Sequence, residues 1–141
     1  MDMILTAREL ELLLLIKSIW EFEAENPGNI PRGGIKEIVV SSLIYESDEY
    51  EECLQKLEQL GFVDKKDKVT TAGNDYIEEF KSSIDETLTE KNGDTLPKEK
   101  KNYLRELCQL LNTDLKKYPI IDNACTIIAI AAGIATIAQM F

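Results

Sequence analysis

Histidine is absent from this sequence of 141 residues, and cysteine occurs only three times. Cys53, Cys108 and Cys125 lie too far apart for a CxxC pair, and no histidine is present to complete a zinc site. The same absence excludes Ser-His and Cys-His nucleophile pairs, which leaves carboxylates and lysines as acid-base groups. We therefore expect no metal site, and we interpret Cys53 and Cys108, which lie beside leucines, as reduced and buried thiols.

Glycine-rich phosphate-binding motifs are also missing. The pair Gly33-Gly34 has neither the G-x-x-x-x-G-K-[ST] spacing nor the G-x-G-x-x-G spacing. Adjacent carboxylates such as Glu51-Glu52 would diverge on a helix rather than converge on a substrate. The sequence predicts a protein that uses no cofactor and is not an enzyme.

The N-terminus lacks the pattern of a secretion signal. Asp2, Arg8, Glu9 and Glu11 interrupt the first apolar residues, so no basic region is followed by an apolar core and a cleavage site. Together with the odd number of cysteines, this favours a cytoplasmic protein.

Positive charge is scarce in the first part of the chain. Residues 1–80 contain 8 Lys and Arg against 18 Asp and Glu, whereas residues 81–141 contain 8 of each, so the net charge of −10 belongs to the first part. Such acidity opposes binding to phosphate backbones or anionic lipids, and it suits a basic protein partner or simply keeps the protein soluble. A content of 44% apolar and 30% charged residues is typical of a folded globular chain.

Helical periodicity is the main positive signal. The first segment, residues 6–25, begins with Thr6 and Glu9 in capping-box spacing and ends at Asn26. It is apolar on nearly all sides, which predicts a central helix surrounded by others. Residues 35–43 predict a second, shorter helix despite their β-branched content.

Residues 47–60 predict a third helix. Ser47 is the expected N-cap and Gly61 the expected end. Its apolar residues form one stripe at helical spacing: Tyr50, Cys53, Leu54, Leu57 and Leu60.

The period of the pattern changes after this helix. Residues 62–63 and 69–70 read as two short strands joined by a charged turn. A further helix follows over residues 71–91, with Thr70 or Thr71 as its cap.

The segment LEQLGFVDKKDKVTTAGNDYI, residues 57–77, resembles part of the MarR-like and PadR-like regulators of prokaryotes. In those families a Leu-Gly-apolar-apolar turn leads into the wing, and a Thr-x-x-Gly element, here Thr70 to Gly73, follows the second wing strand. The order of elements over about residues 6–91 is likewise similar to the winged helix-turn-helix superfamily. The resemblance implies a mainly α fold, a winged helix-turn-helix with a short two-stranded wing.

In winged-helix regulators the third helix enters the major groove of DNA, where Arg, Lys, Asn and Gln usually read the bases. The outward positions of residues 48–59 carry a net charge of −4 here, which would bring carboxylates toward phosphates. We therefore predict a protein-protein interaction module, an adaptor or an inhibitor from a prokaryote or phage. The residues expected to bind a basic protein partner are Glu46, Asp48, Glu49, Glu51, Glu52 and Gln55.

A dimeric DNA-binding transcription regulator is the alternative. Analogy with other winged helices favours it, because most prokaryotic members bind DNA. Its phosphate contacts would come from the start of the second helix and from the wing tip: Arg32, Lys36, Lys65, Lys66 and Lys68.

The last third of the chain reads as a helical hairpin over residues 94–141, appended to a winged-helix domain over residues 1–91. Residues 98–115 predict an amphipathic helix. A second helix has large apolar residues spaced 3, 4, 3 and 4 apart, a seam that either closes the core or forms a homodimer: Ile127, Ile130, Ile134, Ile137 and Phe141.

A membrane tail anchor over residues 123–141 is a second alternative for function. These 19 uncharged residues are barely long enough to span a bilayer, and the preceding Lys116 and Lys117 would remain on the cytoplasmic side. A second face of small residues, which includes Cys125 and Ala129, also occurs between membrane helices. Because alanine contributes little to membrane insertion, we favour a buried helix.

Overall fold

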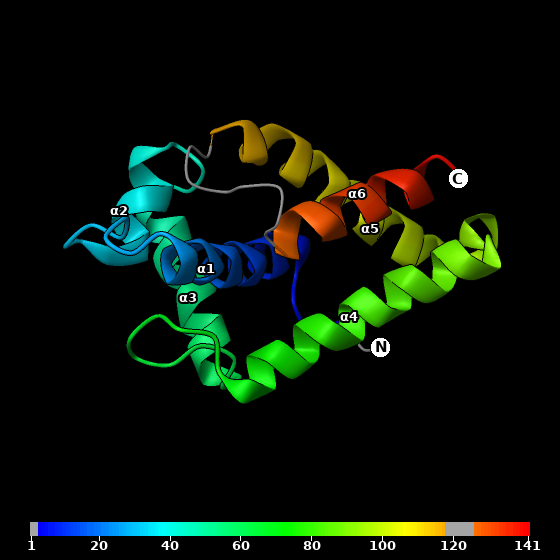
Figure 1. Ribbon diagram of the computed structural model, residues 1–141. Helices are drawn as coiled ribbons and strands as arrows, with labels where there is room; N and C mark the ends of the chain where they lie inside the picture. The colour runs from blue at the N-terminus through cyan, green and yellow to red at the C-terminus, as the bar shows by residue number, and fades with distance from the viewer. Residues whose placement is uncertain (1–2, 118–125) are drawn as a thin grey trace.

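Helix α1 (Ala7–Glu25) lies at the centre of the protein, whose computed structural model describes residues 3–117 and 126–141 (Figure 1). The other elements of this part are α2 (Gly34–Ser41), α3 (Ser47–Gln59), α4 (Thr71–Glu90), η1 (Gly93–Thr95), α5 (Lys98–Asp114), η2 (Leu115–Lys117) and α6 (Thr126–Ala138). The helices η1 and η2 are short 3-10 turns. The prediction of a mainly helical protein is confirmed for the described residues.

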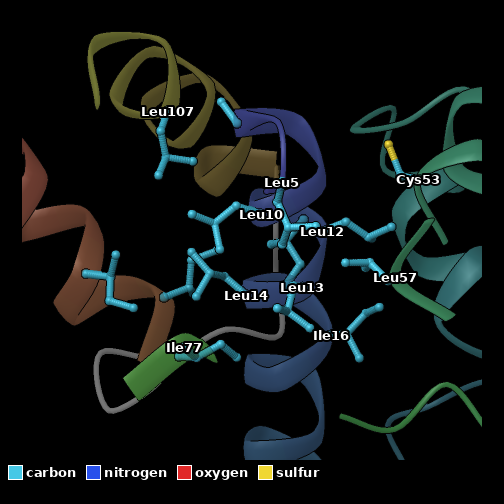
Figure 2. Packing of buried hydrophobic residues seen from close by; sticks show 14 of the residues in the cluster. Leu5, Leu10, Leu12, Leu13, Leu14, Ile16, Cys53, Leu57, Ile77 and Leu107 are labelled. Carbon is cyan, nitrogen blue, oxygen red and sulfur yellow. The ribbon is translucent and has the colours of Figure 1, made fainter. Parts of the chain in front are cut away.

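The central position of α1 follows from its sequence. The predicted capping box is present: Thr6 Oγ1 accepts from the Glu9 backbone N–H at 3.1 Å, and Glu9 Oε1 accepts from the Thr6 N–H at 2.8 Å. Beyond this cap, apolar side chains are buried on all sides of the helix. Figure 2 shows Leu57 of α3 on one side of α1 and Leu107 of α5 on another. Residues from both parts of the chain therefore form one hydrophobic core.

The N-terminus of helix α6 is held against α1 by hydrogen bonds. The Glu21 carboxylate accepts hydrogen bonds from the Thr126 N–H at 3.0 Å and from the Thr126 hydroxyl at 2.7 Å. The Ser18 hydroxyl accepts from the Ile127 N–H at 3.1 Å. Side chains of α1 thus satisfy N–H groups that the first turn of α6 leaves unpaired, and the Glu21 charge faces the positive end of the helix dipole.

The predicted isoleucine seam lies inside this single chain. Ile127, Ile130, Ile134 and Ile137 are 0–2% exposed, and α6 packs against α1, α4 and α5. A Cβ added at Gly133 would lie 2.8 Å from Ile84 Cγ2 of α4, which shows how closely the two helices approach. Of the two roles considered for these isoleucines, closing the core is the one that this packing fits. The interpretation as a homodimer seam does not fit this structure, because the four side chains are already covered by their own chain.

The predicted two-stranded wing is wrong. Within the described residues there is no β-strand, and Val63 and Val69 form one isolated antiparallel bridge. The turn between them is closed by its own side chain, because Asp64 Oδ1 accepts from the Lys66 N–H at 2.8 Å and from the Lys68 N–H at 3.1 Å. Thr70 already caps α4 by accepting from the Gly73 N–H. The segment between α3 and α4 is occupied by the end of α3, the Asp64 turn and the Thr70 cap. Too few residues remain for two strands to pair over more than one bridge.

No helix in the described ranges has both the length and the apolar character needed to cross a bilayer. Helix α6 has 13 residues, which at 1.5 Å per residue is about 20 Å, shorter than the roughly 30 Å hydrocarbon core. Residues 123–125 of the predicted tail anchor, including Cys125, lie outside the described residues.

Candidate functional site

Helix α3 places the predicted partner-binding residues on the surface. Its apolar stripe is buried, with Tyr50, Cys53, Leu54 and Leu57 all less than 9% exposed. The helix begins at Ser47 with Glu46 as its N-cap, so the prediction of Ser47 as the cap is wrong, and no side-chain hydrogen bond caps this end. The stripe holds α3 against α1, and the opposite face is presented to solvent.

The six predicted partner-binding residues divide into two groups. Glu49 and Glu51 form ion pairs, with Arg8 at 2.9 Å and with Lys36 at 2.7 Å respectively. The other four are exposed: Glu46, Asp48, Glu52 and Gln55. The acidic surface, as we call these four residues, therefore carries three carboxylates, one at the N-cap of α3 and two in its first two turns.

The residues predicted for DNA contact differ in their surroundings. Lys36 is paired with Glu51 of α3, and Lys68 lies 4.7 Å from the centre of the Trp20 ring. Arg32, Lys65 and Lys66 are exposed. The charged turn is attached to α1, since Trp20 Nε1 donates to the Asp67 carbonyl at 2.7 Å.

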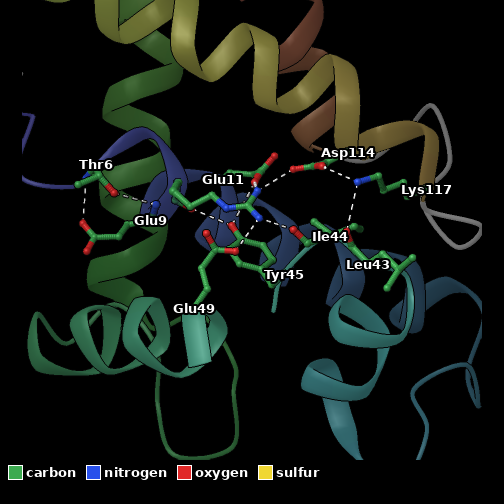
Figure 3. Close-up of polar contacts among 10 residues, drawn as sticks. Thr6, Glu9, Glu11, Leu43, Ile44, Tyr45, Glu49, Asp114 and Lys117 are labelled. Carbon is green, nitrogen blue, oxygen red and sulfur yellow. Dashed lines mark hydrogen bonds and ion pairs between the residues drawn. The ribbon is translucent and has the colours of Figure 1, made fainter. Parts of the chain in front are cut away.

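Glu11, Tyr45, Glu49 and Asp114 belong to a polar cluster (Figure 3), and Arg8 contacts three of its carboxyl groups. One guanidinium nitrogen donates to Glu11 at 2.5 Å and to Asp114 at 2.7 Å, and the other donates to Glu49 at 2.9 Å and to the Ile44 carbonyl. Arg8 thereby joins α1, α3, α5 and the α2–α3 connection. Because carboxylates and a carbonyl occupy its donors, its role is to position these elements rather than to bind an anion.

Glu11 is the most deeply buried member of the cluster, with 0% exposure. Its Oε1 accepts from the Tyr45 hydroxyl at 3.1 Å, while Oε2 has no hydrogen-bond partner. Burial and the neighbouring Asp114 carboxyl raise the pKa of Glu11 to about 8, against the opposing effect of Arg8. Burial also raises the pKa of Tyr45, so its hydroxyl remains a donor. The cluster thus contains a carboxyl group whose protonation is favoured by the fold.

A groove opens beside this cluster, between the α2–α3 connection and α5. Its volume is about 1120 Å³. The connection contributes Leu43 and Glu46, the first turn of α3 contributes Glu49, and α5 contributes one face over residues 106–114. Of the acidic surface, Glu46 lines the groove, whereas Asp48, Glu52 and Gln55 do not.

Sequence reasoning missed Arg8, Glu11 and Asp114. One signal was present: Glu11 and Arg8 stand three residues apart in a segment that is otherwise apolar on nearly all sides, where an acid needs a buried partner. Asp114 gives no such signal, because it ends an amphipathic helix where an acid is ordinarily solvated. Within the described residues, no cluster of three or more His, Cys, Asp or Glu is suited to hold a metal ion.

Comparisons of this chain with protein-family models, with curated proteins and with solved structures found no match. The family resemblance therefore stays a prediction, and the wing it implied is absent from the described residues.

Proposed function

We propose that this protein is a cytoplasmic interaction module, an adaptor or an inhibitor, whose acidic surface binds a basic surface of a protein partner. The observation that carries the proposal is the exposure of Glu46, Asp48, Glu52 and Gln55 on a helix whose other side is buried. Sites on rigid helices are more precise than sites on loops. Complementary charge gives such a surface its partner selectivity and its association rate.

Two features keep the acidic surface in place. The Arg8 cluster holds the first turn of α3 through Glu49. The Lys36–Glu51 ion pair joins α2 to the next turn. Neither pair removes the charge of Asp48 or Glu52, whose carboxylates stay available to a partner.

The test compares three forms of the protein as bait: wild type, Asp48→Lys with Glu52→Lys, and a matched control, Glu78→Lys with Asp85→Lys. All four positions are exposed acids on helices, so both double variants change the net charge equally. Proteins recovered from a prokaryotic lysate are identified by mass spectrometry. Each basic protein lost only from the α3 variant is then purified and its Kd is measured at several salt concentrations.

We expect the α3 variant to weaken binding of such a partner at least tenfold, and added salt to weaken the wild-type complex. Duplex DNA serves as a second probe, and we expect no binding at 50 mM salt or above. A set of partners unaffected by the α3 changes contradicts the proposal. Salt-sensitive binding of duplex that disappears in Lys65→Glu with Lys66→Glu also contradicts it.

A further inference from the structure

Leu43 is an apolar side chain in an unusual position. It is 80% exposed, more than any other large hydrophobic residue described, and its φ of +61° lies in the left-handed region that leucine rarely adopts. Lys117 Nζ donates to its carbonyl at 3.2 Å and ties this turn to the end of α5. A strained backbone that projects a leucine into solvent points to a contact with another molecule.

The facing wall of the groove is a regular helix face. Glu106, Gln109, Leu110 and Thr113 of α5 line it at the spacing of one side of a helix, while Leu107 and Leu111 point into the core. Leu110 on this wall and Val40 and Leu43 on the opposite wall provide apolar contacts. The lining of the groove thus combines these three apolar side chains with charged and polar ones.

The charges that line the groove are mainly negative. Four carboxylates line it, against two cations, Arg8 and Lys117. Arg8 is surrounded by Glu11, Glu49 and Asp114, and Lys117 lies 3.5 Å from Asp114. Three of these four acids are exposed or half-exposed: Glu46, Glu49 and Glu106.

We propose that this groove binds an amphipathic helix of the protein partner, with an apolar side chain seated against Leu43 and Leu110 and with Lys or Arg facing Glu46 and Glu106. This inference rests on the proposed function and specifies the partner segment. Grooves that bind helices combine apolar anchors with charged rims in this way. Charge complementarity selects the occupant: a second copy of this chain, with a net charge of −10, is disfavoured, as is a nucleic acid.

The dimensions of the groove agree with a peptide segment. The facing wall extends over α5 from Glu106 to Asp114, about two and a half turns, and continues to Lys117 in η2, which is enough to contact a helix at successive positions.

The test measures fluorescence anisotropy of a labelled 18-residue amphipathic peptide with leucines on one face and lysines and arginines at its borders. A second peptide keeps the leucines and carries glutamates instead of the basic residues. The full-length chain is used as wild type, Leu43→Gly, Glu106→Lys and the remote control Glu78→Lys. Glycine suits the positive φ at position 43, so Leu43→Gly removes the apolar contact without disturbing the fold.

We expect the basic peptide to bind wild type and the control equally, and to bind Leu43→Gly and Glu106→Lys at least tenfold more weakly. The acidic peptide should not bind. Thermal unfolding of each variant verifies that the fold is retained.

Two outcomes overturn the inference: no binding of the basic peptide to wild type, or equal binding to wild type, Leu43→Gly and Glu106→Lys. To distinguish the second outcome from failure of the proposed function, binding of the basic peptide is also measured with the Asp48→Lys, Glu52→Lys double variant. If that variant alone loses the peptide, the acidic surface binds basic chains and the groove does not take part.

Discussion

At the scale of single residues, Glu11 has the most unusual environment in the described part of the chain. It is fully buried between Arg8, Tyr45 and Asp114, and one of its oxygens has no hydrogen-bond partner. A buried acid beside another acid favours its protonated form, and this is why the pKa of Glu11 is raised from 4.5 to about 8. Protonation of Glu11 therefore contributes to the stability of the fold.

This protonation predicts how stability depends on pH. Because the folded pKa is the higher one, the contribution of Glu11 is fully present below about pH 4.5 and is lost as pH rises through about 8. We expect Glu11→Gln, which stays neutral, to gain stability relative to wild type between about pH 5 and 8, by up to about 1.4 kcal/mol per pH unit, and to gain no more above that range.

Urea unfolding at a series of pH values measures this difference. Glu86→Gln, at an exposed position on α4, corrects for the loss of one charge. A difference between Glu11→Gln and wild type that stays constant from pH 5 to 9 would exclude a titrating Glu11.

At the scale of elements, the start of α4 packs so closely against the residues before it that position 73 has no room for a side chain. A Cβ added at Gly73 would overlap the carbonyl oxygen of Phe62 and lie 2.8 Å from Val69 Cγ1. Thr70 caps this turn, and its N–H donates to the Phe62 carbonyl at 3.0 Å. The start of α4 thus rests directly on backbone that cannot move away.

We therefore expect Gly73→Ala to destabilise the protein by roughly 1–3 kcal/mol, since a clash with backbone outweighs the gain in helix propensity. At an unconstrained helical position the same change usually stabilises by up to about 1 kcal/mol. The free energy of unfolding is measured in urea, with Ala72→Ser at the exposed neighbouring position as the control. A stabilised Gly73→Ala variant would show that α4 does not approach Phe62 this closely.

At the scale of the whole molecule, α6 completes the core that α1, α4 and α5 leave open. Ile134 is 0% exposed at the centre of this contact, whereas Ala129 on the same helix is exposed. Helix α6 therefore provides a buried position at which to test the packing and an exposed position that serves as its control.

We expect Ile134→Ala to reduce the free energy of unfolding by about 2–5 kcal/mol, because it leaves a cavity in a packed core. Ala129→Ser should change it by less than about 0.5 kcal/mol. We also expect the Tm of wild type and of Ile134→Ala to be independent of protein concentration, since this seam packs within one chain. A Tm that rises with concentration, and does so less in Ile134→Ala, would indicate that the isoleucines join two chains instead.

Local signals in the sequence predicted much of the secondary structure. The caps at Thr6 and Thr70 were predictable because each cap involves residues three positions apart. The wing was not, because strand-like residues at 62–63 and 69–70 form a ladder only if the turn leaves them enough backbone. The turn and the two adjacent helix ends limit this pairing to one bridge, in which the Asp64 N–H donates to the Lys68 carbonyl and the Thr70 N–H donates to the Phe62 carbonyl.

The exposure of the candidate site residues was predicted in part. The acidic surface on α3 follows from residues that alternate with an apolar stripe, and it is exposed as expected. The ion pairs of Glu49 and Glu51 were missed, because Arg8 and Lys36 are distant in sequence and only packing brings them to α3. The groove was missed for the same reason, since its walls are separated by about sixty residues.

What the sequence by itself determined is the set of helices, most of their ends, and the acidity of the exposed face of α3. These features depend on interactions within a few residues along the chain, which periodicity and caps record. Only the tertiary structure decided that the α6 isoleucines close their own core, that Arg8 joins Glu11, Glu49 and Asp114, and that Leu43 borders a groove. The reason is that these contacts join residues tens of positions apart, so they depend on how the helices pack around α1.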